Sequence, residues 1–248
     1  SLLAGLPWSV PGETVNRLCS SGMSAIVHAN RAIKAGEGDV FIAGGVENMT
    51  RGPWVISKTS TPFGRDAQMH DSSFGWRFVN LKMKDLYGTD AMGETAENLV
   101  DRFAISREDQ DKFAAWSQQK AAAAQQNGRL AEEIIQVEIP QRKKDPIIFD
   151  KDEFIRAGTT VEGLSKLIPA FRKEGGTVTA GNASGLNDGA AATIIASEDA
   201  VKKYNLKPMA RIVSSAVVGV EPRVMGIGPV GATKLALKRA GLTLDDMD

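Results

Sequence analysis

Two short apolar runs flank a longer, alanine-rich stretch in the first fifty residues. Residues 14–18 and 40–43 are each short and lie next to glycine, which is typical of buried strands. Residues 20–35 are rich in Ala, Ile, Val and Met, and the next residue is Gly36, a residue type that commonly ends helices. Strand, helix and strand within about thirty residues predict a βαβ unit with parallel strands.

The pattern changes in residues 48–175. This region starts with turn-forming residues and scattered aromatics that have no sustained period. Helices are predicted at 92–103 and at 106–128, where Ser-Arg-Glu-Asp forms a capping box at the start of the second helix. An edge strand is predicted within 131–140, ending at a proline, with a charged loop after it. The region therefore has the character of an insertion that covers a sheet.

The strand pattern returns after residue 188. Residues 189–197 and 209–220 are apolar runs that predict two further strands, joined by a polar link at 202–207. Pro229 begins a predicted helix and Gly241 ends it, because proline suits the first turn of a helix and glycine its end.

Composition excludes several classes of function. Hydrophobic residues make up 42% of the 248 residues and charged residues 24%, the balance of a soluble globular protein. Thirty basic and thirty acidic residues cancel, which leaves no charge footprint for nucleic acid or for an anionic membrane. One cysteine and two histidines argue against a metal site and exclude an internal disulfide. We therefore expect no metal, no nucleic acid, no membrane and a reducing, cytoplasmic location.

The candidate chemistry lies at Cys19, between the first predicted strand and helix. A thiol at the first turn of a helix lies in the positive field of unpaired N–H groups, which favours the thiolate. The small residues at 20–22 leave room for an acyl group, so the position suits a nucleophile for acyl transfer. A buried structural cysteine suits it equally well. Neither histidine suits the base that a nucleophile needs: His28 is better explained as a core or interface residue, and His70 as a solvated or structural one.

Five stretches together resemble the thiolase family: NRLCSSGMSAI, AGGVENMTRGP, MGETAENL, GTVTAGNASGLNDGAAA and VMGIGPVGA. They follow the family's order along the whole chain. The stretches HDSSFGWRFVN and PQRKKDPIIFDKDEFIR favour the branch of bacterial 3-oxoadipyl-CoA thiolases, which is related to acetyl-CoA acetyltransferases.

The resemblance implies an α/β thiolase fold, in which a βαβαβαββ half carries an inserted loop domain and a second, similar half follows. It places part of the first half at 1–50, a coenzyme A-binding loop domain at 51–174, a return to the first half at 175–200 and the start of the second half at 201–248. The family motifs GHP, NEAF and CxGGG do not occur in the sequence. We therefore expect an internal piece, truncated at both ends and inactive alone.

The resemblance also implies a function, in which Cys19 is the catalytic nucleophile of an acyltransferase. The expected reaction cleaves 3-oxoadipyl-CoA to succinyl-CoA and acetyl-CoA through an acyl-cysteine, with coenzyme A as co-substrate and no tightly bound cofactor. A homodimer or homotetramer is expected. One alternative is a non-catalytic coenzyme A-binding or scaffold protein, and another is a condensing enzyme of the ketosynthase type. The stretch TAGNASGLNDGA favours a thiolase over the latter.

Eight contacts with coenzyme A follow from the resemblance. Arg156 would meet the nucleotide end, since a guanidinium suits a phosphate or a purine face, and Ser184 would hydrogen-bond the pantetheine arm. The other six residues would pack near the nucleotide or line the pantetheine channel: Ala170, Phe171, Met92, Leu167, Ala180 and Met225.

Substrate preference depends on three further positions. A dicarboxylic acyl chain needs a cation for its far carboxylate, and Arg77 is the first candidate, because it lies among the aromatics of FGWRF. An exposed arginine without that role is the favoured interpretation. Ala91 stands where many short-chain members carry histidine, which argues against acetoacetyl-CoA as the preferred substrate. Ile168 stands where many members carry arginine, and this removes a positive charge near the nucleotide.

Overall fold

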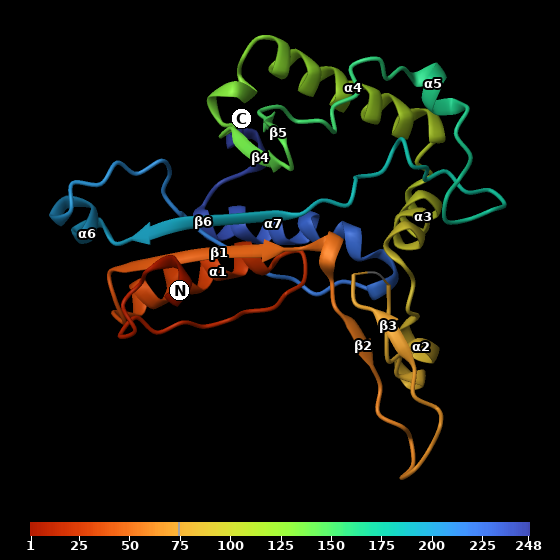
Figure 1. The fold of residues 1–248 in the computed structure, drawn as a ribbon, viewed down its shortest axis with the longest axis horizontal. Coiled ribbons are helices and arrows are strands. Elements are labelled where there is room, and N and C mark those ends of the chain that lie inside the picture. The colour runs from red at the N-terminus through yellow and green to blue at the C-terminus, as the bar shows by residue number, and fades with distance from the viewer. Residues whose placement is uncertain (74) are drawn as a thin grey trace. The chain divides into compact units, whose positions relative to one another are not determined.

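The computed structural model shown in Figure 1 describes residues 1–73 and 75–248. The chain divides into two compact units, each of which is assembled from separate stretches of sequence. The first unit contains Ser1–Arg77, Leu186–Gly219 and Gly228–Asp248, and the second contains Phe78–Gly185 and Val220–Ile227. The four predicted domain ranges divide the chain at other positions and stay predictions.

A two-stranded sheet covered by one helix forms the centre of the first unit (Figure 1). Strand β1 (Val40–Glu47) pairs with β6 (Gly189–Ala196), and helix α1 (Ser21–Ala35) packs against both strands. Close approach explains the glycines of β1, because a Cβ on Gly44 would lie 2.4 Å from the Ala191 carbonyl oxygen. Both strands form where the sequence predicts them, although β1 is longer than expected.

The predicted parallel βαβ unit is wrong. β1 and β6 run antiparallel, with Val40 opposite Ala196 at one end. Residues 14–18 form no strand and contribute only an isolated bridge between Arg17 and Cys19. The reason is local, because the chain turns back on itself just before α1 and no strand of the described residues pairs with this segment. Burial also differs from expectation, since most of β1 is exposed and only its Ala43 is buried.

The helices of the first unit follow the sequence closely. Ser20 is the N-cap of α1, and Gly36 ends the helix in the left-handed conformation, at φ 78°. Helix α7 (Gly228–Ala240) likewise stops before Gly241. The predicted polar link at 202–207 is helical in part, because the short helix α6 (Glu198–Lys203) begins before it, with Ser197 as N-cap.

The predicted strand at 209–220 is also wrong, since these residues have no regular structure. One side chain and one backbone carbonyl of this segment are bound by helix α7. The Ser214 hydroxyl donates to the Ala236 carbonyl oxygen at 2.7 Å, and Arg239 Nη1 donates to the Ser215 carbonyl oxygen at 2.6 Å. An apolar run shows that a segment is buried or packed, but not whether a ladder partner exists.

A small hairpin and three single turns complete the first unit. Strands β2 (Trp54–Ile56) and β3 (Met69–Asp71) pair antiparallel, so the aromatic stretch contains a hairpin that the sequence pattern does not reveal. His70 lies half-buried in β3, opposite Val55. The 3-10 turns are η1 (Leu2–Ala4), η2 (Met49–Arg51) and η5 (Leu244–Asp246).

The second unit is mainly helical. Helix α3 (Met92–Phe103) has the predicted bounds, and α4 (Arg107–Gln126) begins at Ser106, whose hydroxyl accepts the Asp109 N–H at 3.0 Å. Two shorter helices were not predicted, α2 (Leu81–Tyr87) and α5 (Val161–Ser165). The turn η3 (Leu130–Glu132) follows α4, and η4 (Pro222–Ile227) packs against α3.

A β-hairpin lies where an edge strand and a charged loop were predicted. Strand β4 (Val137–Gln141) pairs antiparallel with β5 (Lys144–Phe149), and a register shift occurs between Ile139 and Gln141. Pro140 lies inside β4 and does not end it, because a bulge tolerates a residue without an N–H. The charged stretch therefore supplies a second strand.

No helix among the described residues has both the length and the apolar character that a membrane crossing requires.

Candidate active site

Cys19 lies in a tight turn directly before helix α1. It precedes the N-cap, so it is just outside the first helical turn in which the sequence places it. Leu18 has a positive φ of 48°, and the Ser21 side chain holds the turn. The Ser21 hydroxyl donates to the Leu18 carbonyl oxygen at 2.6 Å and accepts the Arg17 N–H at 2.8 Å. Cys19 is exposed, which removes the alternative of a buried structural cysteine.

The start of α1 is also fixed against the sheet. A Cβ on Gly45 of β1 would lie 3.7 Å from the Gly22 Cα atom, so the two backbones are close neighbours. The first N–H groups of a helix have no partner within the helix, and they create a positive field at its N-terminus. Residues 20–22 are small, and the N–H groups of Ser20 and Ser21 donate to the carbonyl oxygens of Arg17 and Leu18 at 3.1 and 3.0 Å.

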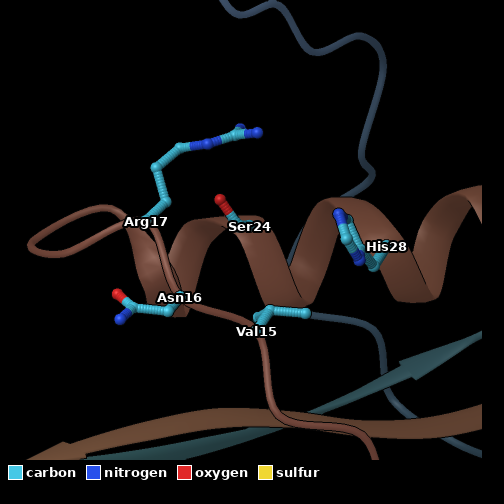
Figure 2. A pocket seen from close by; sticks show the side chains of 5 residues that line it. All are labelled: Val15, Asn16, Arg17, Ser24 and His28. Carbon is cyan, nitrogen blue, oxygen red and sulfur yellow. The ribbon is translucent and has the colours of Figure 1, made fainter.

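A shallow pocket of about 200 Å³ lies beside this turn (Figure 2). Its lining residues come from the segment before Cys19 and from α1: Val15, Asn16, Arg17, Ser24 and His28. The His28 side chain is 44% exposed in this chain, which does not fit a core histidine, and its Nδ1 lies 3.5 Å from Glu13 Oε1. Its place in an interface stays a prediction. Cys19 does not line this pocket, so the pocket does not bring His28 to the candidate nucleophile.

Arg77 does not have the desolvated surroundings that were expected of it. Its guanidinium is exposed and donates through Nη1 to the Gly75 carbonyl oxygen at 3.2 Å. The neighbouring aromatics Trp76 and Phe78 are each 53% exposed, and Phe74 lies outside the described residues. The geometry here therefore gives no support to a role in binding a carboxylate.

All eight candidate coenzyme A contacts lie in the second unit, and several of them lie on segments that touch. The ring of Phe171 packs on the first turn of α3, beside Met92. A Cβ on Gly93 would lie 2.2 Å from that ring. Leu167 packs in the same way against Gly181, where a Cβ would lie 2.5 Å from its Cδ1 atom. Ala170 lies on the same segment, and its N–H donates to the Val178 carbonyl oxygen at 2.9 Å. This bond joins the segment to the loop around residue 178.

The remaining candidates are less closely grouped. Met225 lies on η4, which is bound to α3, since Asn98 Nδ2 donates to the Arg223 carbonyl oxygen at 2.9 Å. Arg156 is exposed, and its N–H donates to Gln118 Oε1 on α4 at 2.8 Å. Ala180 and Ser184 are exposed too.

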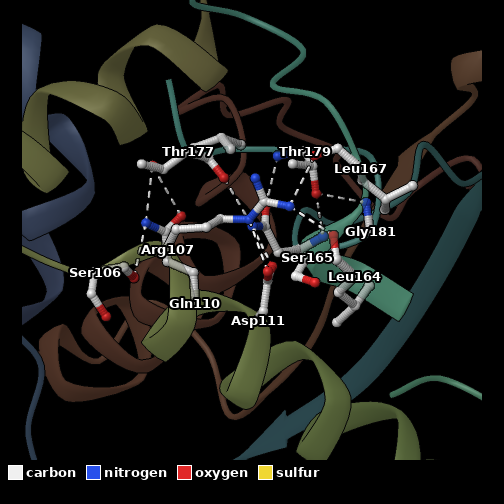
Figure 3. Close-up of polar contacts among 12 residues, drawn as sticks. Ser106, Arg107, Gln110, Asp111, Leu164, Ser165, Leu167, Thr177, Thr179 and Gly181 are labelled. Carbon is white, nitrogen blue, oxygen red and sulfur yellow. Dashed lines mark hydrogen bonds and ion pairs between the residues drawn. The ribbon is translucent and has the colours of Figure 1, made fainter. Parts of the chain in front are cut away.

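A buried polar network holds the loops that carry these candidates, as Figure 3 shows for the part around Arg107 and Asp111. Arg107 Nε donates to Asp111 Oδ2 at 2.8 Å, and the Asp111 side chain is only 1% exposed. Arg107 Nη2 donates to the carbonyl oxygens of Leu164 and Leu167 at 2.7 and 3.0 Å. The other Asp111 oxygen accepts Asn182 Nδ2 at 3.0 Å. One ion pair on α4 therefore binds two loops that are distant in sequence.

Glu97 forms a second attachment, from helix α3. Its side chain is fully buried and accepts hydrogen bonds from the loop that begins at Thr177. Glu97, Arg107 and Asp111 were not among the site residues that the sequence predicts. The sequence held one signal for Glu97. Gly93 and Glu97 are four residues apart, so they share one face of the helix, and this face packs on the loops.

Ion pairs on α3, and one at Asp90 just before it, join the same loops and η4 to this part of the chain. Arg172 binds Glu94 Oε1 through Nη2 at 2.6 Å and Asp101 Oδ2 through Nη1 at 2.8 Å, and these carboxylates raise the pKa of Arg172. Arg223 Nε lies 2.9 Å from Asp90 Oδ2 and holds the pKa of that carboxyl below its usual value. Among the described residues, no three His, Cys, Asp or Glu side chains gather as metal ligands.

Two family models identify the protein family to which this chain belongs. The family described as thiolase, N-terminal domain, matches residues 1–199, and the thiolase C-terminal domain matches residues 206–248. The chain belongs to the thiolase family. Its fold is the thiolase N-terminal domain followed by the start of the C-terminal domain, as the sequence predicted.

Individual relatives agree with this assignment. A beta-ketoadipyl-CoA thiolase of Acinetobacter baylyi is 56% identical over 248 residues, and a 3-oxoadipyl-CoA/3-oxo-5,6-dehydrosuberyl-CoA thiolase of Escherichia coli is 55% identical. Both alignments cover 100% of this chain and 62% of the relative. A human mitochondrial 3-ketoacyl-CoA thiolase, solved in complex with CoA, matches with a TM-score of 0.85 and 44% identity. That match covers 100% of this chain and 60% of the solved chain. The chain thus spans about 62% of the length of the curated relatives it matches.

Proposed function

We propose that the protein is an acyltransferase that cleaves a 3-oxoacyl-CoA, with 3-oxoadipyl-CoA as its substrate. The observation that carries the proposal is an exposed cysteine at the N-terminus of α1 in a chain of the thiolase family. The choice of substrate rests on the relatives that are 53–56% identical and are named for beta-ketoadipyl-CoA or 3-oxoadipyl-CoA.

The chemistry begins when the Cys19 thiolate attacks the 3-keto carbon of the substrate. The bond between C2 and C3 then breaks, and its electrons leave with acetyl-CoA as a carbanion that takes up a proton. The succinyl group stays on Cys19 as a thioester. The thiolate of free coenzyme A attacks that thioester, succinyl-CoA leaves, and the Cys19 thiolate is restored.

The turn around Cys19 contributes to both steps in this proposal. Two tetrahedral intermediates form, and each places negative charge on an oxygen next to the Cys19 sulfur. The Cys19 N–H and the start of α1 would stabilise that charge, because preorganised donors cost no reorganisation during the reaction. The Ser21 hydroxyl would hold the turn in the geometry that presents these groups.

Coenzyme A would bind to the second unit. Phe171 and Ala170 would pack near the nucleotide end that Arg156 meets. Ser184 would bind the pantetheine arm, and four residues would line its channel: Met92, Leu167, Ala180 and Met225. Support comes from the contacts that join the segments of Phe171, Leu167 and Ala170 to α3 and to the 177–181 loop. Arg77 stays the proposed partner of the substrate's far carboxylate, although its exposure does not favour it.

Two further proposals concern the whole protein. The resemblance to thiolases implies an assembly of two or four chains. We propose that this protein also forms a homodimer or a homotetramer. A lone reactive thiol also needs a reducing compartment, so we propose a cytoplasmic location.

Mass spectrometry tests the reaction directly. The full-length protein is incubated with 3-oxoadipyl-CoA or with acetoacetyl-CoA, and the peptide that contains Cys19 is analysed. We expect a succinyl group on Cys19 from the first substrate, little acetyl group from the second, and neither on a Cys19→Ser variant. Binding of coenzyme A without any acylation of Cys19 would instead identify the non-catalytic alternative.

A further inference from the structure

Glu97 is the largest side chain in the described structure that is buried completely. It lies in the middle of α3, and its carboxylate faces a loop and not an ion partner. Its Oε1 accepts the N–H groups of Thr177 and Val178 at 2.7 and 2.8 Å, and its Oε2 accepts the Thr177 hydroxyl at 2.8 Å. Three donors therefore converge on one carboxylate from two consecutive residues.

Stability alone does not explain a buried carboxylate at this position. Removing a carboxylate from water costs several kcal/mol, and a well-packed apolar side chain in the same place is often as stable or more stable. A carboxylate that accepts two adjacent N–H groups does fix the orientation of the loop, because both hydrogen bonds form in only one orientation. All of its donors come from the loop, so Glu97 acts as an acceptor that sets backbone geometry.

The backbone that Glu97 holds continues into a tight polar turn. Thr179 donates its N–H to Asn182 Oδ1 at 2.7 Å, and Asn182 Nδ2 donates to the Thr177 carbonyl oxygen at 3.0 Å. The Thr179 hydroxyl accepts the Gly181 N–H at 3.2 Å. These bonds make residues 177–182 one unit, with Ala180 exposed at its tip.

We propose that Glu97 is a positioning residue for coenzyme A, which sets the orientation of the 177–182 turn and so the place of Ala180 and Ser184. The inference rests on the proposed function, because it assumes that these two residues meet the pantetheine arm. Glu97 itself touches no substrate in this proposal. It acts through two anchors, the Thr177 and Val178 N–H groups, and it shares the Thr177 hydroxyl with Gln110, whose Nε2 donates to it at 3.0 Å.

The decisive substitution is Glu97→Gln, which keeps the shape of the side chain and one acceptor oxygen. With its oxygen toward the two N–H groups, its amide nitrogen would face the Thr177 hydroxyl as a donor. The hydrogen bond that this hydroxyl donates to Glu97 is then lost, and the bonds from the two N–H groups no longer go to a charged acceptor. We expect the Kd of coenzyme A, measured by isothermal titration calorimetry, to rise roughly ten-fold. Amide hydrogen exchange should become faster at residues 177–182 and stay unchanged in α4. The matched control is Glu108→Gln, whose side chain is 69% exposed and pairs with Lys112 on the same unit.

A second pair of variants keeps the inference testable if Glu97→Gln does not fold. Thr177→Val removes the hydroxyl that binds Glu97, while Thr177→Ser retains it. We expect a several-fold rise in the Kd of coenzyme A for valine and a value near wild type for serine. A purely structural role would lower the melting temperature of the variants without a change in that Kd, and this result would overturn the inference.

The outcomes also separate this inference from the proposed function. If the wild-type protein does not bind coenzyme A, the proposed function fails, whatever the variants do. If the wild type binds and both Glu97→Gln and Thr177→Val bind equally well, only the role of Glu97 is wrong. Weaker binding by these two variants, with Glu108→Gln and Thr177→Ser unchanged, supports the inference.

Discussion

The two units hold their candidate residues in different ways. In the first unit Cys19 is presented by contacts within a few residues, since the Ser21 hydroxyl bonds to the backbone of Arg17 and Leu18. In the second unit the loops are held by side chains far away in sequence, with Glu97 eighty residues from Thr177. A local turn can be inferred from a short motif, but a site built from long-range polar contacts cannot. Substitutions in each unit can test this difference between local and long-range support.

Asp111→Ala should have the largest effect. The substitution leaves Arg107 without its buried carboxylate and Asn182 without an acceptor. Removing one partner of a buried ion pair costs about 3 kcal/mol or more of unfolding free energy, and the effect should be confined to the second unit. Denaturant unfolding measures this loss, and Glu108→Ala is the surface control that should stay near wild type. Unchanged stability of Asp111→Ala would show that the network does not hold these loops.

Gly93→Ala should act on one loop only. The new methyl group would lie 2.2 Å from the Phe171 ring, so the ring must move, although Ala is the better helix former by about 1 kcal/mol. Phe171 is 49% exposed, so it can swing outward at little cost in stability. We therefore expect weaker coenzyme A binding with a nearly unchanged melting temperature. Equal affinity in titration calorimetry would remove Phe171 from the proposed contacts.

Ser21→Ala tests the local turn of the first unit. The hydroxyl makes two short bonds at an exposed position, so its removal should cost about 1 kcal/mol or less of stability. The expected effect is a slower acylation of Cys19, followed as the rate of succinyl incorporation by quenched mass spectrometry. Coenzyme A binding to the second unit should not change. A loss of coenzyme A affinity would contradict the division between local and long-range support.

The same division explains which parts of the fold the sequence could reveal. Helices α1, α4 and α7 were predictable, because serine, proline or glycine residues mark their ends locally. Helix α3 has the predicted bounds although Ala91 and Ala104 lie at its two caps. The strand predicted at 14–18 and the parallel pairing of β1 were wrong, because an apolar run does not specify its ladder partner.

The candidate site divides in the same manner. The place of Cys19 directly before a helix was predictable from the motif around it, and its catalytic role stays a prediction. The anchors Glu97 and Asp111 were not, because a charged residue within a helix is normally solvated, and only the fold shows that these two are buried. Arg77 shows the opposite error, since neighbouring aromatics in the sequence do not ensure a desolvated side chain.

The smallest predicted effect concerns pH and the attachment of η4 to α3. Arg223 donates to Asp90 at 2.9 Å, and Asn98 Nδ2 donates to the same Asp90 oxygen at 2.9 Å. These bonds, that from Arg223 above all, lower the pKa of Asp90 in the folded protein below the usual value of an aspartate, 3.8. The ionised carboxylate therefore adds stability above that value, and this contribution is lost as the pH falls through the lower, folded pKa. We expect Asp90→Asn to be slightly less stable than wild type at pH 7, with the difference shrinking toward pH 3. Denaturant unfolding at both pH values measures the two differences, and a difference that grows on acidification would show that Asp90 does not hold η4 as an ionised group.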